Sequence, residues 1–272
     1  MAQIDLNKVK GIIFDYGGTL DTGGDHWSYV IADAYKKAGV YLSNEAFRDA
    51  YVFGERELAR TLHILPHHTF ADLMLIKIKI EMEELAAGSV IPANLIDTKA
   101  PEIANYCYEA ARESVDKAKP VLKALAEKYK LVLVSNFYGN ISTVLKDFGI
   151  DGYFSDIIES AVVGVRKPDP KIFELGARAM GLMPEETLVI GDSYRKDIEP
   201  AEKAGAQVLW LKGKGWTAEE DAQLHPNIIS SLHDVLQLIC GSEPDQPSVD
   251  AVDVDPISGD IQIEDSTDLN PN

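Results

Sequence analysis

The chain has 272 residues, of which 46% are hydrophobic and 26% are charged, a composition typical of a globular protein with a sizeable core. Its 26 basic and 44 acidic residues give a net charge of −18, which disfavours binding to nucleic acid or to an anionic membrane surface. No segment approaches the roughly 20 consecutive apolar residues of a membrane-spanning helix, so we expect neither a nucleic-acid-binding nor a membrane protein.

The cysteine content gives information about the cellular compartment. Only Cys107 and Cys240 are present, and they form no metal-ligand pattern. Neither a disulfide framework nor a structural zinc site is indicated, and a reducing cytoplasm is the expected location. The first residues also lack the basic segment and long apolar core of a secretion signal.

Apolar segments rich in β-branched residues predict the strands of a parallel sheet. The strands expected are residues 9–14, 131–134, 154–160, 188–190 and 206–211. Helical patterns lie between them, including residues 121–130, 170–180 and 200–204. This alternation predicts an α/β fold with a doubly wound, Rossmann-like parallel sheet. Such sheets bind ligands at the carboxyl ends of their strands, where this chain places Asp15, Ser135 and Asp192.

A long insertion separates the first two expected strands, which lie more than a hundred residues apart instead of the roughly 2–6 of a strand-to-helix loop. Residues 22–116 are therefore expected to form an inserted domain, and residues 1–21 and 117–240 to form the core domain. The stretch 76–82 alternates apolar and polar residues as a strand does, but the length and continuation of its segment favour a helix. The helices expected in the insert are residues 44–59, 69–87 and 100–115.

The last segment, residues 241–272, is acidic and rich in Ser, Pro and Asp. It holds nine acidic residues and no basic residue, so half of the net charge of −18 lies there. This composition predicts a disordered tail. The alternative is a small hairpin that pairs residues 252–254 with residues 261–263 across a Pro-Ile-Ser-Gly turn.

A carboxylate on a tight turn follows the first strand, in the sequence Asp15-Tyr16-Gly17-Gly18-Thr19. A carboxylate followed by two glycines is typical of a nucleophile that is presented where the backbone can approach a ligand closely. In the alternative interpretation, Asp15 only caps the turn and the glycines only bend it.

The motifs that follow make the chain resemble the haloacid dehalogenase (HAD) superfamily. Ser135-Asn136 comes after the second strand, Lys167 begins the run KPDP, and the run GDS at 191–193 precedes Asp197. The four motifs of the superfamily are an Asp followed by Gly-Thr, a Ser or Thr, a Lys, and a Gly-Asp with a second acid. The resemblance covers residues 8–240 and implies a HAD core in which residues 22–116 form an α-helical cap.

The resemblance implies a Mg²⁺-dependent hydrolase, most simply a phosphatase that acts on a small phosphorylated metabolite through an aspartyl phosphate on Asp15. Mg²⁺ prefers oxygen ligands, and a lysine supplies a point charge to a phosphoryl group. The implied catalytic residues are Asp15, Lys167 and Ser135. The implied substrate-binding residues are Thr19, Ser135, Asn136 and Lys167. The implied metal ligands are Asp15, the Gly17 carbonyl, Asp192 and Asp197.

One position departs from the family pattern. In the phosphatases of the family, the second residue after the nucleophile is usually an Asp that acts as general acid and then as base, whereas this chain has Gly17. Acid–base catalysis contributes roughly 10²–10⁴-fold, so acyl or aryl phosphates are the more forgiving substrates. Asp21, Asp25 and His26 are the nearby candidates for a replacement.

Other functions stay open at this point. Gly17 is compatible with a catalytically weak or inactive protein that binds phosphate and metal. Two further branches of the superfamily lack the second Asp, namely the carbon–halogen hydrolases, which usually lack the Gly-Asp pair, and the carbon–phosphorus hydrolases. The latter form an imine on a cap lysine, for which the chain offers Lys36, Lys37, Lys77 and Lys79. The residues of the insert that are able to face a cleft are Arg56, Arg60, His63, His67 and His68. The sequence selects neither a substrate nor an oligomeric state.

Overall fold

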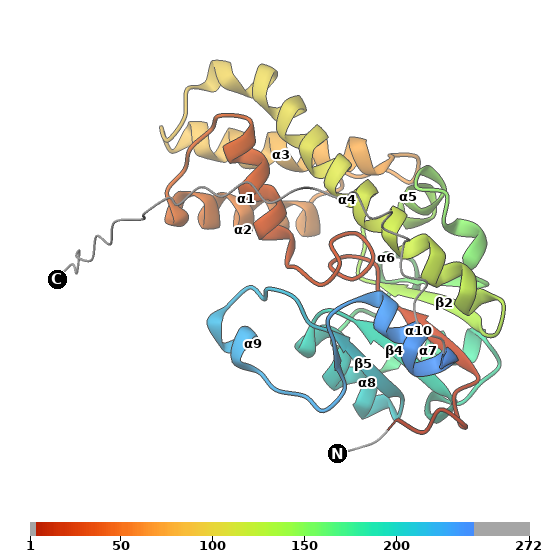
Figure 1. The fold of residues 1–272 in the computed structure, drawn as a ribbon. Helices are drawn as coiled ribbons and strands as arrows, with labels where there is room; N and C mark the ends of the chain where they lie inside the picture. The colour runs from red at the N-terminus through yellow and green to blue at the C-terminus, as the bar shows by residue number, and fades with distance from the viewer. Residues whose placement is uncertain (1–3, 242–272) are drawn as a thin grey trace, which may run out of the picture. The chain divides into compact units, whose positions relative to one another are not determined.

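The computed structural model describes residues 4–241 (Figure 1). The strands are β1 (Gly11–Phe14), β2 (Lys130–Ser135), β3 (Asp156–Glu159), β4 (Thr187–Gly191), β5 (Gln207–Leu211) and β6 (Ile228–Ile229). The α-helices are α1 (Trp27–Lys37), α2 (Asn44–Arg60), α3 (Phe70–Ala87), α4 (Ile96–Ala126), α5 (Ile141–Asp147), α6 (Ser160–Val163), α7 (Lys171–Ala179), α8 (Glu199–Ala204), α9 (Ala218–Ala222) and α10 (Leu232–Cys240). Within these residues, no helix is long and apolar enough to cross a membrane. The expected acidic tail and its alternative hairpin lie, from residue 242 on, outside the described part of the chain.

The strands form one parallel sheet in the order β3-β2-β1-β4-β5-β6. The predicted α/β fold with a doubly wound sheet is confirmed, and all five expected strands are present. The edge strand β6 was not expected, because two residues give no periodic signal. β2 and β3 follow β1 on one side of the sheet, whereas β5 and β6 follow β4 on the other side. Where the strand order reverses in this way, a crevice forms at the carboxyl ends of the two central strands, β1 and β4.

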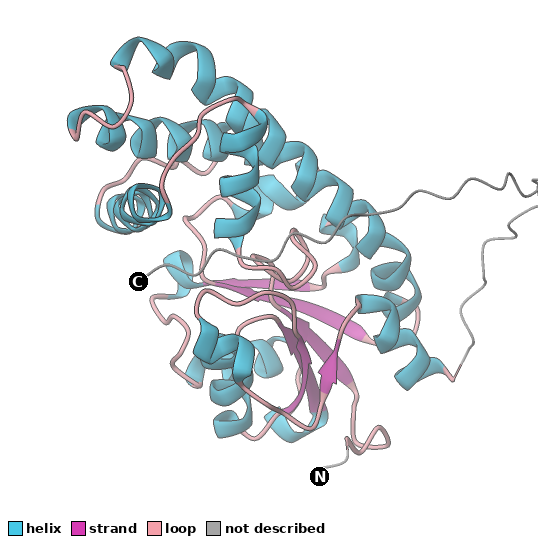
Figure 2. Ribbon diagram, turned by 60° about the vertical axis from the view of Figure 1, so that its left-hand side comes forward, coloured by secondary structure: helices cyan, strands magenta, loops and turns pink. Residues whose placement is uncertain are grey.

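Helices cover both faces of the sheet (Figure 2). Successive side chains of a strand point to opposite faces, so Phe14 of β1 joins a cluster with Leu122 of α4 and Val144 of α5. Ile13 of the same strand joins the cluster on the other face with Phe173 of α7. This burial on both faces explains why the strands appear in the sequence as continuous apolar runs.

The segment with period-two alternation is helical, as expected. Thr69 begins α3 with a capping box, in which its side chain and that of Asp72 each bind the backbone N–H of the other residue. Lys77, Ile78 and Ile80 are all buried although they point in different directions around the helix, because α2 and α4 both pack against α3. The helix is therefore apolar on several sides, which hides its 3.6-residue period.

The helices expected separately at residues 100–115 and 121–130 are one continuous element, α4, so that prediction of two helices is wrong. Pro120 lies inside α4, where a proline costs roughly 3 kcal/mol. The fully buried side chains of Val121 and Leu122, each worth roughly 1.5–3 kcal/mol, offset this cost. α4 packs against α1 and α3 of the insert and also contacts β2 and α10 (Figure 1). Because α4 runs from Ile96 to Ala126, the domain boundary expected at residue 116 falls within this single helix.

Candidate active site

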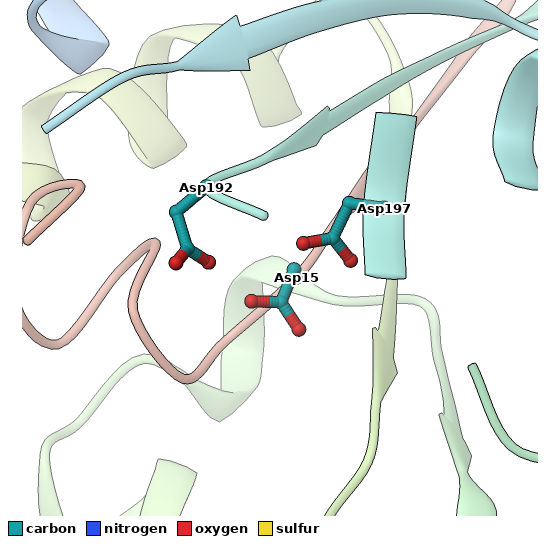
Figure 3. Close-up of side chains that lie close together, drawn as sticks. All are labelled: Asp15, Asp192 and Asp197. Carbon is teal, nitrogen blue, oxygen red and sulfur yellow. The ribbon is translucent and has the colours of Figure 1, made fainter. Parts of the chain in front are cut away.

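Three aspartates converge at the carboxyl ends of β1 and β4 (Figure 3). Asp15 follows β1 and Asp192 follows β4, whereas Asp197 lies in a π-helical turn, η4 (Tyr194–Ile198). One carboxylate oxygen of each residue lies within 4.8 Å of those of the other two. Single π-helical turns are frequent at functional sites, and this one brings the carboxylate of Asp197 up to the other two.

Lys167 supplies a positive charge to this cluster. Its Nζ lies 2.5 Å from Asp15 Oδ1 and 2.6 Å from Asp197 Oδ1, and the residue is only 4% exposed. Burial disfavours the ammonium form, but attraction by the two carboxylates outweighs burial and raises the pKa of Lys167 above its ordinary value. The side chain therefore carries its charge throughout the physiological pH range.

The cluster retains an excess of negative charge. Burial, followed by repulsion from Asp15 and Asp197, raises the pKa of Asp192 well above its ordinary value. Burial also raises the pKa of Asp197 to about 6, even though Lys167 acts in the opposite direction. A divalent cation with oxygen ligands relieves this kind of repulsion, so the donor atoms present fit a metal ion.

The turn after Asp15 lies against Asp192. Gly18 has a φ of +95°, and a Cβ at this position would lie 2.3 Å from Asp192 Oδ2, so the turn requires glycine. Thr19 Oγ1 lies 2.9 Å from Asp15 Oδ2 and 3.1 Å from Asp192 Oδ1. Gly17 is different, because it is exposed and a Cβ there would have no atom within 4 Å. Packing therefore does not require a glycine at position 17.

Asp21 connects this turn to the first inserted helix. Its Oδ1 accepts a hydrogen bond from the Gly18 N–H at 2.7 Å, and its Oδ2 accepts one from the Trp27 indole N–H at 3.0 Å. The residue is 1% exposed, and burial raises the pKa of Asp21 to about 8. Both carboxylate oxygens are engaged, so the contacts of Asp21 are those of a group that fixes the turn.

The other two candidates for the missing acid differ in position. His26 Nδ1 accepts the Ser28 N–H at the start of α1, and its ring packs 5.0 Å from that of Trp216. Burial, followed by the charge of Lys196, lowers the pKa of His26 to about 4, so the ring is neutral at pH 7 and is a poor proton donor. Asp25 Oδ1 accepts the backbone N–H of Lys214.

The two residues expected after the second strand have different surroundings. Ser135 ends β2, is 2% exposed and lines the cavity of the site. The Asn136 side chain binds the backbone of Lys167, because Oδ1 accepts its N–H at 2.9 Å and Nδ2 donates to its carbonyl at 3.0 Å. The side chain of Asn136 thus positions Lys167.

These groups line a cavity of about 840 Å³ that also includes residues of the inserted helices. Arg56 of α2 lines the cavity, whereas Arg60 and His63, which lies just beyond α2, both contact Glu57. The side chains that the sequence analysis did not identify include Tyr51, Glu55, Met74 and Trp216. They belong to no short motif, so no sequence signal was available to find them.

Comparisons with known proteins agree with this arrangement. The family described as haloacid dehalogenase-like hydrolase matches residues 9–205. A glyceraldehyde 3-phosphate phosphatase from Methanocaldococcus jannaschii is 38% identical over 92 residues, which cover 34% of this chain and 40% of that protein. The chain thus spans less than half the length of this relative. The protein of the same name from Methanopyrus kandleri is 29% identical over 216 residues, which cover 75% of this chain and 84% of that protein.

Solved structures show the same fold. The magnesium-bound crystal structure of the HAD-hydrolase YfnB from Bacillus subtilis has a TM-score of 0.52 at 18% sequence identity. The superposition covers 85% of this chain and 98% of that structure. With the match over residues 9–205 and the motif residues gathered at the ends of β1, β2 and β4, the chain belongs to the haloacid dehalogenase-like hydrolases.

Proposed function

We propose that the chain is a Mg²⁺-dependent phosphatase that transfers the phosphoryl group of a small phosphorylated metabolite first to Asp15 and then to water. The observation that carries this proposal is the buried contact of Lys167 with Asp15 and Asp197, beside Asp192. The relatives named glyceraldehyde 3-phosphate phosphatase add support for a phosphate monoester as substrate.

In the first step, the Asp15 carboxylate attacks phosphorus, an O–P bond forms, and the P–O bond to the leaving group breaks. Lys167 and the Ser135 hydroxyl donate hydrogen bonds to the phosphoryl oxygens and offset the charge that repels an anionic nucleophile. Gly17 has no side chain to act as an acid, so the leaving oxygen takes its proton from water. In the second step, water attacks phosphorus and loses a proton to the solvent, the bond to Asp15 breaks, and inorganic phosphate and a free carboxylate result.

Asp15, Asp192, Asp197 and the carbonyl of Gly17 would hold Mg²⁺. When bound, the ion supplies positive charge that compensates the carboxylates and the phosphate. Lys167 by itself offsets only one of the three carboxylate charges. We further propose that residues 22–116 act as a cap that excludes water from the cavity, over a core formed by residues 1–21 and 117–240.

The rival hydrolytic activities have less support. Of the four lysines available for an imine, Lys77 is the one that lines the cavity. Burial disfavours its charged form, but the Glu55 carboxylate outweighs this and raises the pKa of Lys77 above its ordinary value. A protonated amine is not a nucleophile toward a carbonyl group, which argues against a carbon–phosphorus hydrolase. The Asp192 and Asp197 carboxylates argue against a metal-independent dehalogenase.

Phosphate release from p-nitrophenyl phosphate, with and without Mg²⁺, tests the proposal. We expect hydrolysis that requires the metal and is abolished by Asp15→Asn. Hydrolysis that survives this substitution would refute the assignment of Asp15. Metal-dependent binding of beryllofluoride without turnover would instead support a binding protein, the rival that Gly17 favours.

A further inference from the structure

The inserted helices contribute one continuous wall to the cavity that contains Asp15. On α3, the lining residues Phe70, Leu73, Met74 and Lys77 recur every three or four positions, so they lie along one side of the helix. On α2, Glu55 lies one turn beyond the lining residue Tyr51. The wall is therefore apolar along most of α3 and polar where α2 and α3 meet.

An ion pair occupies the polar part of this wall. Lys77 Nζ contacts Glu55 Oε1 and lies 4.6 Å from the centre of the Tyr51 ring. The lysine side chain is 6% exposed, whereas that of Glu55 is 40% exposed. The pair thus turns its carboxylate toward the cavity and keeps its ammonium covered.

Both members of the pair stay charged at neutral pH. Burial would raise the pKa of Glu55, but Lys77 outweighs it and lowers the pKa below its ordinary value. Because the buried ammonium neutralises the carboxylate, the pair has little net charge and still offers a strong hydrogen-bond acceptor through the second oxygen of Glu55. Such an acceptor favours hydroxyl donors and disfavours a carboxylate, which has no donor to offer it. Because the pair has little net charge, it attracts an ammonium group only weakly.

Aromatic side chains line the same cavity as this acceptor. The rings of Tyr51 and Trp216 are 5.3 Å apart, those of His26 and Trp216 are 5.0 Å apart, and all three residues line the cavity. Carboxylates accept hydrogen bonds from sugar hydroxyls, as the acidic residue of dinucleotide-binding folds does from ribose. Aromatic faces cover the C–H surface of the same kind of molecule.

We propose that Glu55, held by Lys77, forms a subsite for the hydroxyl groups of the leaving group, and that the substrates are phosphate monoesters of polyols or sugars. This inference rests on the proposed phosphatase function. It assigns Glu55 as the residue that contacts the substrate and Lys77 as the residue that positions it.

Three phosphate esters with the same six-carbon chain test the subsite, namely sorbitol 6-phosphate, n-hexyl phosphate and 6-phosphogluconate. We expect kcat/KM of the wild-type protein to be highest for sorbitol 6-phosphate, by about tenfold over each of the others, the size of one charged hydrogen bond. Glu55→Gln should reduce this preference about tenfold.

Glu57→Gln is the matched control, because Glu57 lies on the same helix but contacts Arg60 and His63. It should keep the wild-type preference. Lys77→Arg, which preserves the ion pair, should keep more of the preference than Lys77→Met. If Glu55→Gln melts below the assay temperature, Glu55→Asp, which shortens the side chain, should show the same loss.

The outcomes separate the two proposals. Absence of turnover on every ester overturns the phosphatase function and this inference together. If the aryl ester is hydrolysed but the wild type and Glu55→Gln show the same preference for sorbitol 6-phosphate, the subsite alone is overturned. A wild-type preference for 6-phosphogluconate also overturns it, because exposed cations of the cavity such as Arg56 and Lys196 would then dominate recognition.

Discussion

Replacing Gly17 by aspartate should restore the proton donor that this chain lacks. A Cβ at position 17 would have no atom within 4 Å, the residue is exposed, and its φ lies outside the left-handed region. The new side chain therefore enters open space on the same turn as Asp15. Replacing a glycine in such a place removes unfolded-state entropy and stabilises by roughly 0.4–1 kcal/mol, so we expect Gly17→Asp to fold.

The magnitude follows from the chemistry of the leaving group. A positioned acid contributes roughly 10²–10⁴-fold, and we expect the lower end, about 10²-fold, because position 17 has no neighbour to orient the new carboxyl group. This gain should appear in kcat/KM for an alkyl phosphate such as glycerol 3-phosphate, whose leaving group needs a proton. It should be absent from kcat/KM for p-nitrophenyl phosphate, whose leaving group departs as a stable anion.

Two controls isolate the effect. Gly17→Asn gives a side chain of nearly the same size as aspartate, but its amide is not acidic enough to protonate a leaving group. It should therefore leave both values of kcat/KM near those of the wild type. Gly152→Asp places the same substitution at another position where a Cβ meets no atom within 4 Å. A Gly17→Asp variant that binds Mg²⁺ normally but is no faster on the alkyl ester would refute our account of this position.

Three further predictions concern Glu81, a buried residue of α3, Asn136, which binds the Lys167 backbone, and Gly18, which lies against Asp192. Burial raises the pKa of Glu81 to about 7, above its ordinary value of 4.5; the folded state therefore binds the proton more tightly, and stability falls as pH rises from 4.5 to 7. Glu81→Gln should remove this loss. Between pH 4.5 and 8, the unfolding free energy of the variant should therefore rise by about 3 kcal/mol relative to that of the wild type. Parallel curves of unfolding free energy against pH for the two proteins would contradict this. Asn136→Ala removes both hydrogen bonds to the Lys167 backbone and should lower kcat on aryl phosphate about tenfold with KM little changed; an unaltered kcat would show that Lys167 needs no such support. Gly18→Ala brings a methyl group into Asp192, and titration calorimetry should show weaker Mg²⁺ binding, whereas wild-type affinity would show that the turn adapts.

The residues at the ends of strands could be predicted from the sequence, because each follows an apolar run that is buried on both faces. Asp15, Ser135 and Asp192 are of this kind, and the structure gathers them at one edge of the sheet. The contact between Glu55 and Lys77 could not be predicted in the same way. These residues lie 22 positions apart on different helices, and only the packing of α2 against α3 brings them together.

The elements of the fold that local sequence signals define could also be predicted, whereas those that depend on tertiary packing could not. Local periodicity located α2 and α3 almost to the residue, because each helix begins at a capping serine or threonine, Ser43 or Thr69. It failed at Pro120, where the local rule predicts a break and tertiary burial of the following turn maintains the helix. The orientation of the Asn136 amide depends on Lys167, 31 residues away, and no local rule describes it.

The shared use of Asp21 has a consequence for engineering within this fold. The Asp21 carboxylate binds both the Gly18 amide and the Trp27 indole. It therefore connects the turn that follows Asp15 directly to α1, the first inserted helix. A chimera that exchanges the insert at residue 22 would separate the indole from its acceptor and would loosen Gly18 against Asp192. Grafts intended to change substrate preference should therefore transfer residues 15–27 as a single cassette.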